Sequence, residues 1–188
     1  MPVSILILPG LGNSGPDHWQ TWLERRHPDA RRVEQGDWDQ PGRDAWVDAL
    51  EAAVTAAAGP VVLVAHSLAC SQVAHWVGRG SAGHASVGRV AGALLVAPSD
   101  VDSEAHTPPE VRCFAPVPLA PLPFRATLVA SRNDPYVAFD RARFVAERWG
   151  AAFVDAGEQG HINVASGHGP WPEGERMLLD LIAGAERP

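Results

Sequence analysis

Short apolar runs alternate along the chain with longer segments in which apolar residues recur every three or four positions. The short runs predict six strands, at residues 3–8, 30–33, 61–65, 90–97, 126–130 and 152–154. The longer segments predict five helices, at residues 17–27, 43–58, 67–78, 138–149 and 173–185. The second helix shows the pattern best, because Trp46, Leu50, Val54 and Ala57 form one apolar stripe. This alternation of strands and helices is typical of a parallel sheet covered by helices.

Several of the predicted strands are apolar on both faces, as strands buried between two helix layers are. We therefore expect a three-layer α/β fold with a mostly parallel, six-stranded sheet and helices on both faces. No internal repeat and no linker divides the chain, and 188 residues fit one ordinary domain. A single domain over residues 1–188 is the expectation.

The composition changes only between residues 98 and 123, where seven prolines preclude a regular helix or a central strand. We interpret this segment as an ordered loop over the sheet edge, with a disordered segment as the alternative. Order is favoured by apolar anchors that a solvated tail does not need: Val111, Phe114, Leu119, Leu122 and Phe124. The segment is too short and too stiff for several packed helices, so we expect no cap domain.

Charge and composition exclude several classes of function. The formal net charge is -7, from 22 acidic and 15 basic residues, which argues against a nucleic-acid partner. No apolar run approaches the roughly 20 residues that cross a bilayer, and no basic segment precedes the first strand, so we expect neither membrane insertion nor a signal peptide. All 15 basic residues are Arg, which removes chemistry that needs a Lys amine. The two cysteines are too few for a disulfide framework, and we expect a reducing cytoplasm.

The sharpest local signal is a strand that ends at a serine and is followed by a helix. Ser67 has Ala65 two residues before it and Ala69 two residues after it, within the sequence VVLVAHSLA. Small residues at these places are typical of a nucleophile elbow, the tight strand-to-helix turn that usually carries Gly there. The alternative is that Ser67 is an ordinary helix N-cap.

A serine nucleophile needs a base and a carboxylate that orients the base, each at the end of a later strand. Asp134 follows the fifth predicted strand in SRNDPYV, and His161 follows the sixth in GEQGHIN. The chain order Ser, Asp, His is the order of α/β-hydrolases. We therefore assign Ser67 as the nucleophile, Asp134 as the orienting carboxylate and His161 as the base.

A glycine-rich loop, LPGLGNSG, follows the first strand. In hydrolases this loop gives one amide of the oxyanion hole and the residue after the nucleophile gives the other, which here are Leu11 and Leu68. The competing interpretation is a dinucleotide-binding loop that starts at Gly10 and Gly12. Its fingerprint is incomplete, because no acidic residue ends a clear second strand to hold a ribose.

These motifs resemble the small serine hydrolases that include retinoblastoma-binding protein nine, a compact branch of the α/β-hydrolase superfamily. The resemblance covers nearly the whole chain, from PG near the start through HSL, SRNDPY and GHIN to SG and GPWP near the end. It implies the strand order 2-1-3-4-5-6 and the same roles for Ser67, Asp134 and His161. Family members commonly have Gly where this chain has Ala65 and Ala69.

Together these features predict an esterase-like serine hydrolase that cleaves a small carboxylic ester, thioester or activated amide through a Ser67 acyl-enzyme. The expected partner is a small-molecule acyl substrate, with no cofactor, and no protein partner is indicated. The alternative from another class is a non-catalytic module that keeps the elbow but binds a protein or a small ligand.

The spacing of the histidines does not indicate a metal site. His66 and His75, and likewise His161 and His168, have spacings that put no two imidazoles on one helix face, so no metal site is expected. His66 is expected to pack under the sheet end, and Cys70 to be a buried structural thiol. Trp19 and Trp171 lie near the predicted site in sequence, and we expect them to form pocket walls that limit substrate length.

Overall fold

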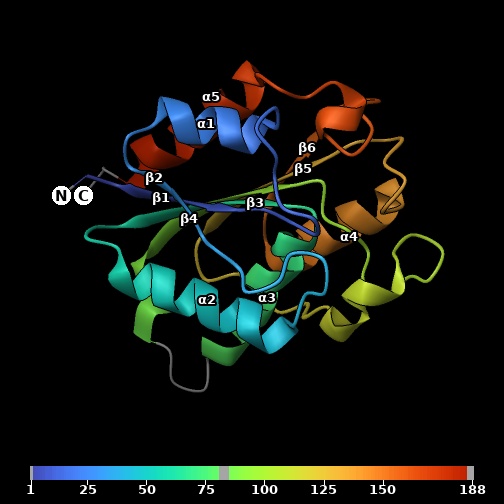
Figure 1. Ribbon diagram of the computed structural model, residues 1–188, viewed down its shortest axis with the longest axis horizontal. Helices are drawn as coiled ribbons and strands as arrows, with labels where there is room; N and C mark the ends of the chain where they lie inside the picture. The colour runs from blue at the N-terminus through green and yellow to red at the C-terminus, as the bar shows by residue number, and fades with distance from the viewer. Residues whose placement is uncertain (1, 81–84, 186–188) are drawn as a thin grey trace.

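A six-stranded, entirely parallel sheet runs through the molecule (Figure 1). The computed structural model describes residues 2–80 and 85–185. The strands are β1 (Ser4–Leu8), β2 (Ala30–Arg32), β3 (Val61–His66), β4 (Val90–Val96), β5 (Arg125–Ala130) and β6 (Ala152–Asp155). Their order in the sheet is β2-β1-β3-β4-β5-β6, which confirms the predicted α/β-hydrolase order.

Helices cover both faces of the sheet, as expected (Figure 1). One face carries α1 (Trp19–Arg26) and α5 (Pro172–Ala185). The other carries α2 (Arg43–Ala56), α3 (Leu68–Gly80) and α4 (Phe139–Trp149). Three short 3-10 helices lie in connections: η1 (Ala85–Arg89), η2 (Pro109–Phe114) and η3 (Val164–Ser166).

Three helices begin later than the sequence pattern predicts: α1, α3 and, by one residue, α4. For α1 and α3 the structure shows a local reason. The side chain of His18 accepts a hydrogen bond from the backbone N–H of Gln20, so His18 is the N-cap and α1 begins at Trp19. Ser67 has a φ of 57°, in the left-handed region, so α3 begins only at Leu68.

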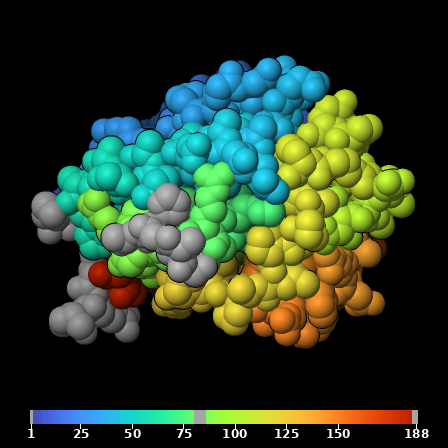
Figure 2. Space-filling view, turned by 90° about the horizontal axis from the view of Figure 1, so that it is seen from below, coloured from blue at the N-terminus to red at the C-terminus, as the bar shows by residue number. Residues whose placement is uncertain are grey.

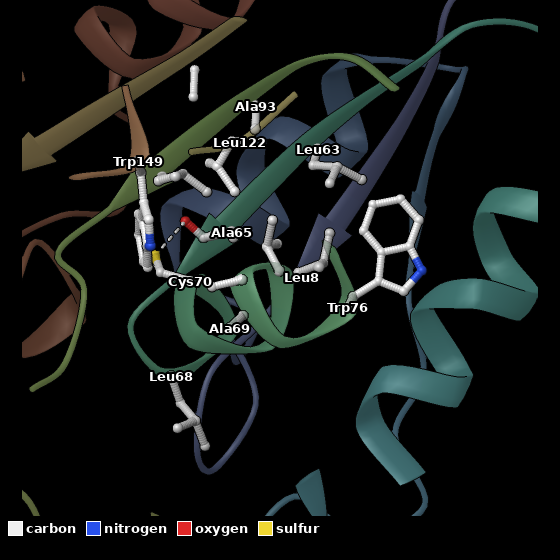
Figure 3. Packing of buried hydrophobic residues seen from close by; sticks show 14 of the residues in the cluster. Leu8, Leu63, Ala65, Leu68, Ala69, Cys70, Trp76, Ala93, Leu122 and Trp149 are labelled. Atoms are coloured by element: carbon white, nitrogen blue, oxygen red, sulfur yellow. Dashed lines mark hydrogen bonds between the residues drawn. The ribbon is translucent and has the colours of Figure 1, made fainter. Parts of the chain in front are cut away.

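The strands divide the core into two layers, because successive side chains point to opposite faces. Leu63 and Ala65 face α2, α3 and α4, whereas Val62 and Val64 face α1 and α5. Figure 3 shows the first layer, in which Trp76 and Trp149 lie with the aliphatic side chains of the strands. Both faces of the central strands are therefore buried, as the apolar runs predict.

The proline-rich segment between β4 and β5 is ordered, as expected, but it does not lie over a sheet edge. The edge strands are β2 and β6, whereas this segment joins two interior strands. Phe114 packs against Trp46 of α2 with ring centroids 5.8 Å apart, and the indole of Trp149 donates to the carbonyl of Pro118 at 2.8 Å. In Figure 2 the segment, coloured yellow-green, covers one end of the molecule beside α2. The apolar anchors of this segment pack against the helix layer of α2 and α4, so the segment lies at the end of the sheet.

Candidate active site

Four loops meet at the carboxyl ends of the strands, which lie side by side in a parallel sheet. The loop after β1 is the glycine-rich loop. The loops after β3, β5 and β6 carry Ser67, Asp134 and His161, in that order. Although these residues are far apart in sequence, the topology brings all four loops to one place.

The turn at Ser67 is tight, and the loop after β1 packs directly against it. The left-handed φ of 57° at Ser67 is costly for a residue with a side chain. A Cβ at Gly10 would lie 2.9 Å from the Cβ of Ser67 and 3.0 Å from the carbonyl oxygen of His66, so only Gly fits there. Ala65 and Ala69 are fully buried. Their methyl groups are therefore accommodated at the places where an elbow usually has Gly.

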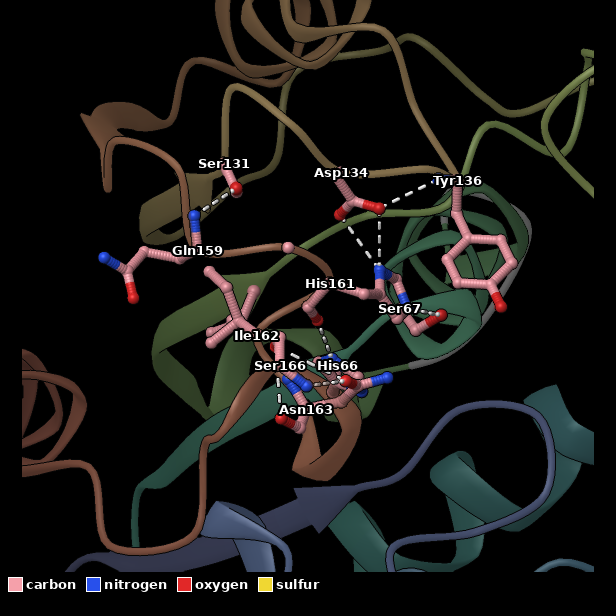
Figure 4. Close-up of polar contacts among 12 residues, drawn as sticks. His66, Ser67, Ser131, Asp134, Tyr136, Gln159, His161, Ile162, Asn163 and Ser166 are labelled. Carbon is pink, nitrogen blue, oxygen red and sulfur yellow. Dashed lines mark hydrogen bonds and ion pairs between the residues drawn. The ribbon is translucent and has the colours of Figure 1, made fainter.

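His161 links Ser67 and Asp134 in one series of hydrogen bonds (Figure 4). Its Nδ1 lies 3.0 Å and 2.9 Å from the two carboxylate oxygens of Asp134, and its Nε2 lies 2.8 Å from the Ser67 hydroxyl oxygen. Because a carboxylate only accepts hydrogen bonds, Nδ1 carries the proton and Nε2 presents a lone pair to Ser67. Asp134 is also held by the backbone N–H of Tyr136, which donates to it at 2.9 Å. This geometry can transfer a proton from serine to imidazole.

Hydrogen bonds to consecutive backbone carbonyls hold the loop that carries His161. The Nε2 of His66 donates to the carbonyl of His161 at 3.0 Å, and the indole of Trp19 donates to that of Ile162 at 2.8 Å. Ile162 has a φ of 47°, which is rare for a β-branched residue. The two bonds fix this unusual backbone and thereby the direction of the imidazole.

Two further histidines, His66 and His18, lie near His161 and stay uncharged. The ring of His66 lies 4.9 Å from the rings of both His161 and His18, measured between centroids. Burial, followed by the charge on His161, holds the pKa of His66 well below its usual value. Burial and the nearby charge of Arg32 lower the pKa of His18 to about 4. Sequence reasoning placed His66 under the sheet end, but it lines the site and holds the His161 loop.

Leu11 and Leu68, whose backbone amides are the predicted donors of the oxyanion hole, line the same cavity as Ser67. Leu68 follows Ser67 directly, and Leu11 follows Gly10, which touches Ser67. Neither amide has a hydrogen-bond acceptor within residues 2–80 and 85–185. Both are thus free to donate to an oxyanion formed at Ser67.

A cavity of about 220 Å³ opens above Ser67. Three histidines, residues of the proline-rich segment and Tyr136 contribute to its lining. The lining residues are Gly10, Leu11, Asn13, His18, His66, Ser67, Leu68, Ser99, Thr107, Pro108, Val111, Tyr136, His161 and Asn163. This lining contains no carboxylate and no guanidinium group.

Trp19 and Trp171 do not line this cavity, which corrects the prediction that they form its walls. Trp19, the first residue of α1, is fully buried against the loop that carries His161, and its ring packs on Trp171 with centroids 5.1 Å apart. Trp171 faces a different hollow, next to β6 and α5. Their positions in the sequence correctly put both tryptophans near the loops of the site. The sequence does not show on which side of those loops the two rings lie.

The actual wall residues were not singled out as such by the sequence. Val111 was predicted only as an apolar anchor, yet it lines the cavity together with Thr107 and Pro108. His18 could have been found from its place at the start of a predicted helix, where a capping side chain is expected. No comparable signal marks Tyr136.

Neither thiol nor metal chemistry has support at this site. Cys70 is fully buried one helical turn after Ser67, and burial raises the pKa of its thiol, the opposite of what a thiolate nucleophile needs. No group of three or more His, Cys, Asp and Glu side chains is placed to bind a metal in the described part of the chain.

Comparison with known proteins places the chain in a family. A family model described as serine hydrolase matches residues 5–180. The chain belongs to the serine hydrolase family. This membership confirms the resemblance to small serine hydrolases of the α/β-hydrolase fold, and the protein is a hydrolase. No curated protein matches the chain in sequence.

Solved structures agree with this assignment. A protein described as a YdeN-like hydrolase from Pectobacterium atrosepticum is 33% identical, with a TM-score of 0.83 over 97% of this chain and 91% of its own. The ydeN gene product of B. subtilis is 20% identical, with a TM-score of 0.76 over 97% of this chain and 100% of its own. Esterase 2 of Thermogutta terrifontis, at 13% identity and a TM-score of 0.71, shares the fold over 100% of this chain and 85% of its own.

None of the helices in residues 2–80 and 85–185 is both long enough and apolar enough to cross a membrane.

Proposed function

We propose that this serine hydrolase cleaves a small, uncharged carboxylic ester, thioester or activated amide through an acyl-enzyme on Ser67. The observation that carries the proposal is the unbroken series of hydrogen bonds from Asp134 through His161 to Ser67. A lone serine is a poor nucleophile, and an adjacent oriented imidazole is what activates it.

In the first half-reaction the Ser67 hydroxyl oxygen attacks the carbonyl carbon while its proton passes to Nε2 of His161. The negative charge that develops on the carbonyl oxygen is stabilised by the amides of Leu11 and Leu68. Asp134 keeps Nδ1 protonated and stabilises the imidazolium. His161 then returns its proton to the leaving group as the bond to the acyl carbon breaks.

In the second half-reaction water takes the place of the leaving group. The oxygen of the water attacks the acyl carbon while His161 accepts a proton from that water. The amides of Leu11 and Leu68 again stabilise the oxyanion. The proton then returns to the Ser67 oxygen, which releases the carboxylic acid. Because His161 must be uncharged to act as the base in both steps, we expect turnover to fall on acidification.

Labelling with a fluorophosphonate tests the assignment of the nucleophile. Intact-mass measurement should show one probe added to the wild-type protein and none added to Ser67→Ala. Ser99→Ala is the matched control, because Ser99 also lines the cavity but its hydroxyl has no hydrogen-bond partner among the described residues, and this variant should label normally. Labelling that persists in Ser67→Ala would overturn the assignment, and a folded wild-type protein that takes no probe would favour the non-catalytic binding module.

Turnover of 4-nitrophenyl acetate tests the other two roles. His161→Ala should abolish hydrolysis, and Asp134→Asn should lower kcat by several orders of magnitude, because the amide no longer holds the imidazole in the required tautomer. Circular dichroism should show that both variants keep the fold. Activity near the wild-type level in either variant would remove that residue from the mechanism.

A further inference from the structure

His18 has one ring nitrogen that is committed to the fold and one that is not. Its Nδ1 accepts the backbone N–H of Gln20 at 3.1 Å and so caps the first turn of α1. Its other nitrogen, Nε2, has no hydrogen-bond partner within the described residues. Nε2 is also not fully buried, and His18 lines the cavity, so a molecule in the cavity can reach this nitrogen.

The capping bond decides where the proton of His18 lies. Because Nδ1 uses its lone pair to accept from Gln20, the single proton of the neutral ring is on Nε2. Protonating Nδ1 would break the cap, and burial opposes the charged form as well, so the ring is neutral at physiological pH. His18 therefore presents an N–H donor, with no charge, to whatever occupies the cavity.

This donor stands apart from the reacting atoms. The ring of His66 touches both His161 and His18, so His18 lies one ring away from the base. The oxyanion already has the two free amides of Leu11 and Leu68 beside Ser67. A donor at His18 would thus reach a different atom of the substrate.

We infer that the Nε2–H of His18 is a specificity determinant that binds a second, uncharged oxygen of the substrate, an ether, hydroxyl or keto oxygen. The inference rests on the proposed ester hydrolysis and names its substrate class: small oxygen-bearing esters in preference to all-carbon esters of the same shape. An all-carbon substrate covers the Nε2–H without offering it an acceptor. The donor then loses contact with water and stays unpaired, which weakens binding in the transition state. The absence of any cationic group from the lining favours a neutral oxygen over a carboxylate.

Pairs of esters with the same shape test this inference. In the acyl arm, 4-nitrophenyl methoxyacetate is compared with 4-nitrophenyl butyrate. In the alcohol arm, 2-methoxyethyl butyrate is compared with butyl butyrate. The two esters of a pair differ only in one methylene group that is replaced by oxygen. The ratio of their kcat/KM values therefore measures the effect of that oxygen on kcat/KM.

The variant His18→Ser removes the Nε2–H donor but keeps an oxygen that can cap α1. We expect the oxygen-to-carbon ratio to fall about fivefold from wild type to variant in one arm, the size of one neutral hydrogen bond. Intrinsic differences in ester reactivity cancel, because they are the same for both proteins. The arm that responds shows whether the oxygen belongs to the acyl or the alcohol part.

His18→Asn, which also caps well, repeats the comparison in case His18→Ser folds poorly. An unchanged ratio in both arms, in a folded variant whose wild type hydrolyses all four esters, would overturn the role of His18. Failure of the wild type to hydrolyse any of the four esters would instead contradict the proposed function.

Discussion

The indole nitrogen of Trp19 donates a hydrogen bond to the backbone carbonyl of Ile162, 2.8 Å away, and so ties α1 to the loop that carries His161. Ile162 has a left-handed backbone conformation that a β-branched residue adopts only when its surroundings impose it. A tryptophan in the core, out of contact with the cavity, therefore sets the direction of the proposed base.

Replacing Trp19 with Phe keeps a large ring in the core but removes this bond. We expect kcat for a small ester to fall several-fold with little change in KM, because the imidazole is less well held while the cavity is intact. The free energy of unfolding should fall by about 1 kcal/mol or somewhat more.

Trp171→Phe is the control for this prediction. The Trp171 ring packs on Trp19, but its indole N–H makes no hydrogen bond within the described residues. This variant should lose stability without a matching loss of kcat. Equal kcat values for Trp19→Phe and the wild type would show that the bond to Ile162 does not position His161.

The sequence predicts the framework of this protein well because the framework depends on local pattern. Apolar runs mark strands that are buried on both faces, and the order of Ser67, Asp134 and His161 follows from the ends of those strands. The fold and family are confirmed. His161 also lies within hydrogen-bonding distance of both Asp134 and Ser67.

The cavity wall is less predictable, because it depends on how long connections fold back over the sheet. Trp19 and Val111 illustrate this in opposite ways. The tryptophan looks like a wall residue and is a core residue, whereas the valine looks like a core anchor and also lines the cavity. Both are apolar, and only the path of the backbone decides which space each side chain fills.

The low pKa of His18 predicts a pH dependence of stability. In the unfolded chain a histidine titrates near a pKa of about 6.5, whereas the folded protein holds the pKa of His18 at about 4. Between these values the unfolded state binds more protons, so stability is full above pH 6.5 and falls as the pH is lowered toward 4. The loss from this group is about 3 kcal/mol. At pH 5 about 2 kcal/mol of this loss should already be present, so urea unfolding followed by tryptophan fluorescence at pH 7.5 and pH 5 should show it. His18→Asn should be less sensitive to pH.

The cavity volume predicts a preference for short acyl chains. A space of about 220 Å³ holds a small ester but not a long chain, so acetyl and butyryl esters should be cleaved faster than decanoyl esters, with no jump in rate on emulsified triglyceride. Val111→Ala should shift the preference toward longer chains, at a stability cost of about 1 to 3 kcal/mol. A series of 4-nitrophenyl esters measures both effects. A wild-type preference for long chains would show that residues 98–123 move aside.

The uncharged lining predicts discrimination against acidic substrates. The mono-4-nitrophenyl ester of succinic acid resembles the pentanoyl ester in size but carries a carboxylate, which would lose its hydration without gaining a cationic partner. We expect its kcat/KM to be at least about tenfold lower than that of the pentanoyl ester at pH 7.5. Equal values would mean that a basic group reaches the substrate.

The path of the proline-rich segment has an evolutionary consequence. Ser67, Asp134 and His161 are each attached to a sheet strand, whereas Thr107, Pro108 and Val111 belong to one connection between β4 and β5. Mutations in that connection can reshape the space above the serine while leaving the strands beneath it untouched. Part of substrate choice is thus encoded in a stretch of the gene that is separate from the three residues of the proposed chemistry, and descendants of this protein can change the size of the cavity by altering one connection alone.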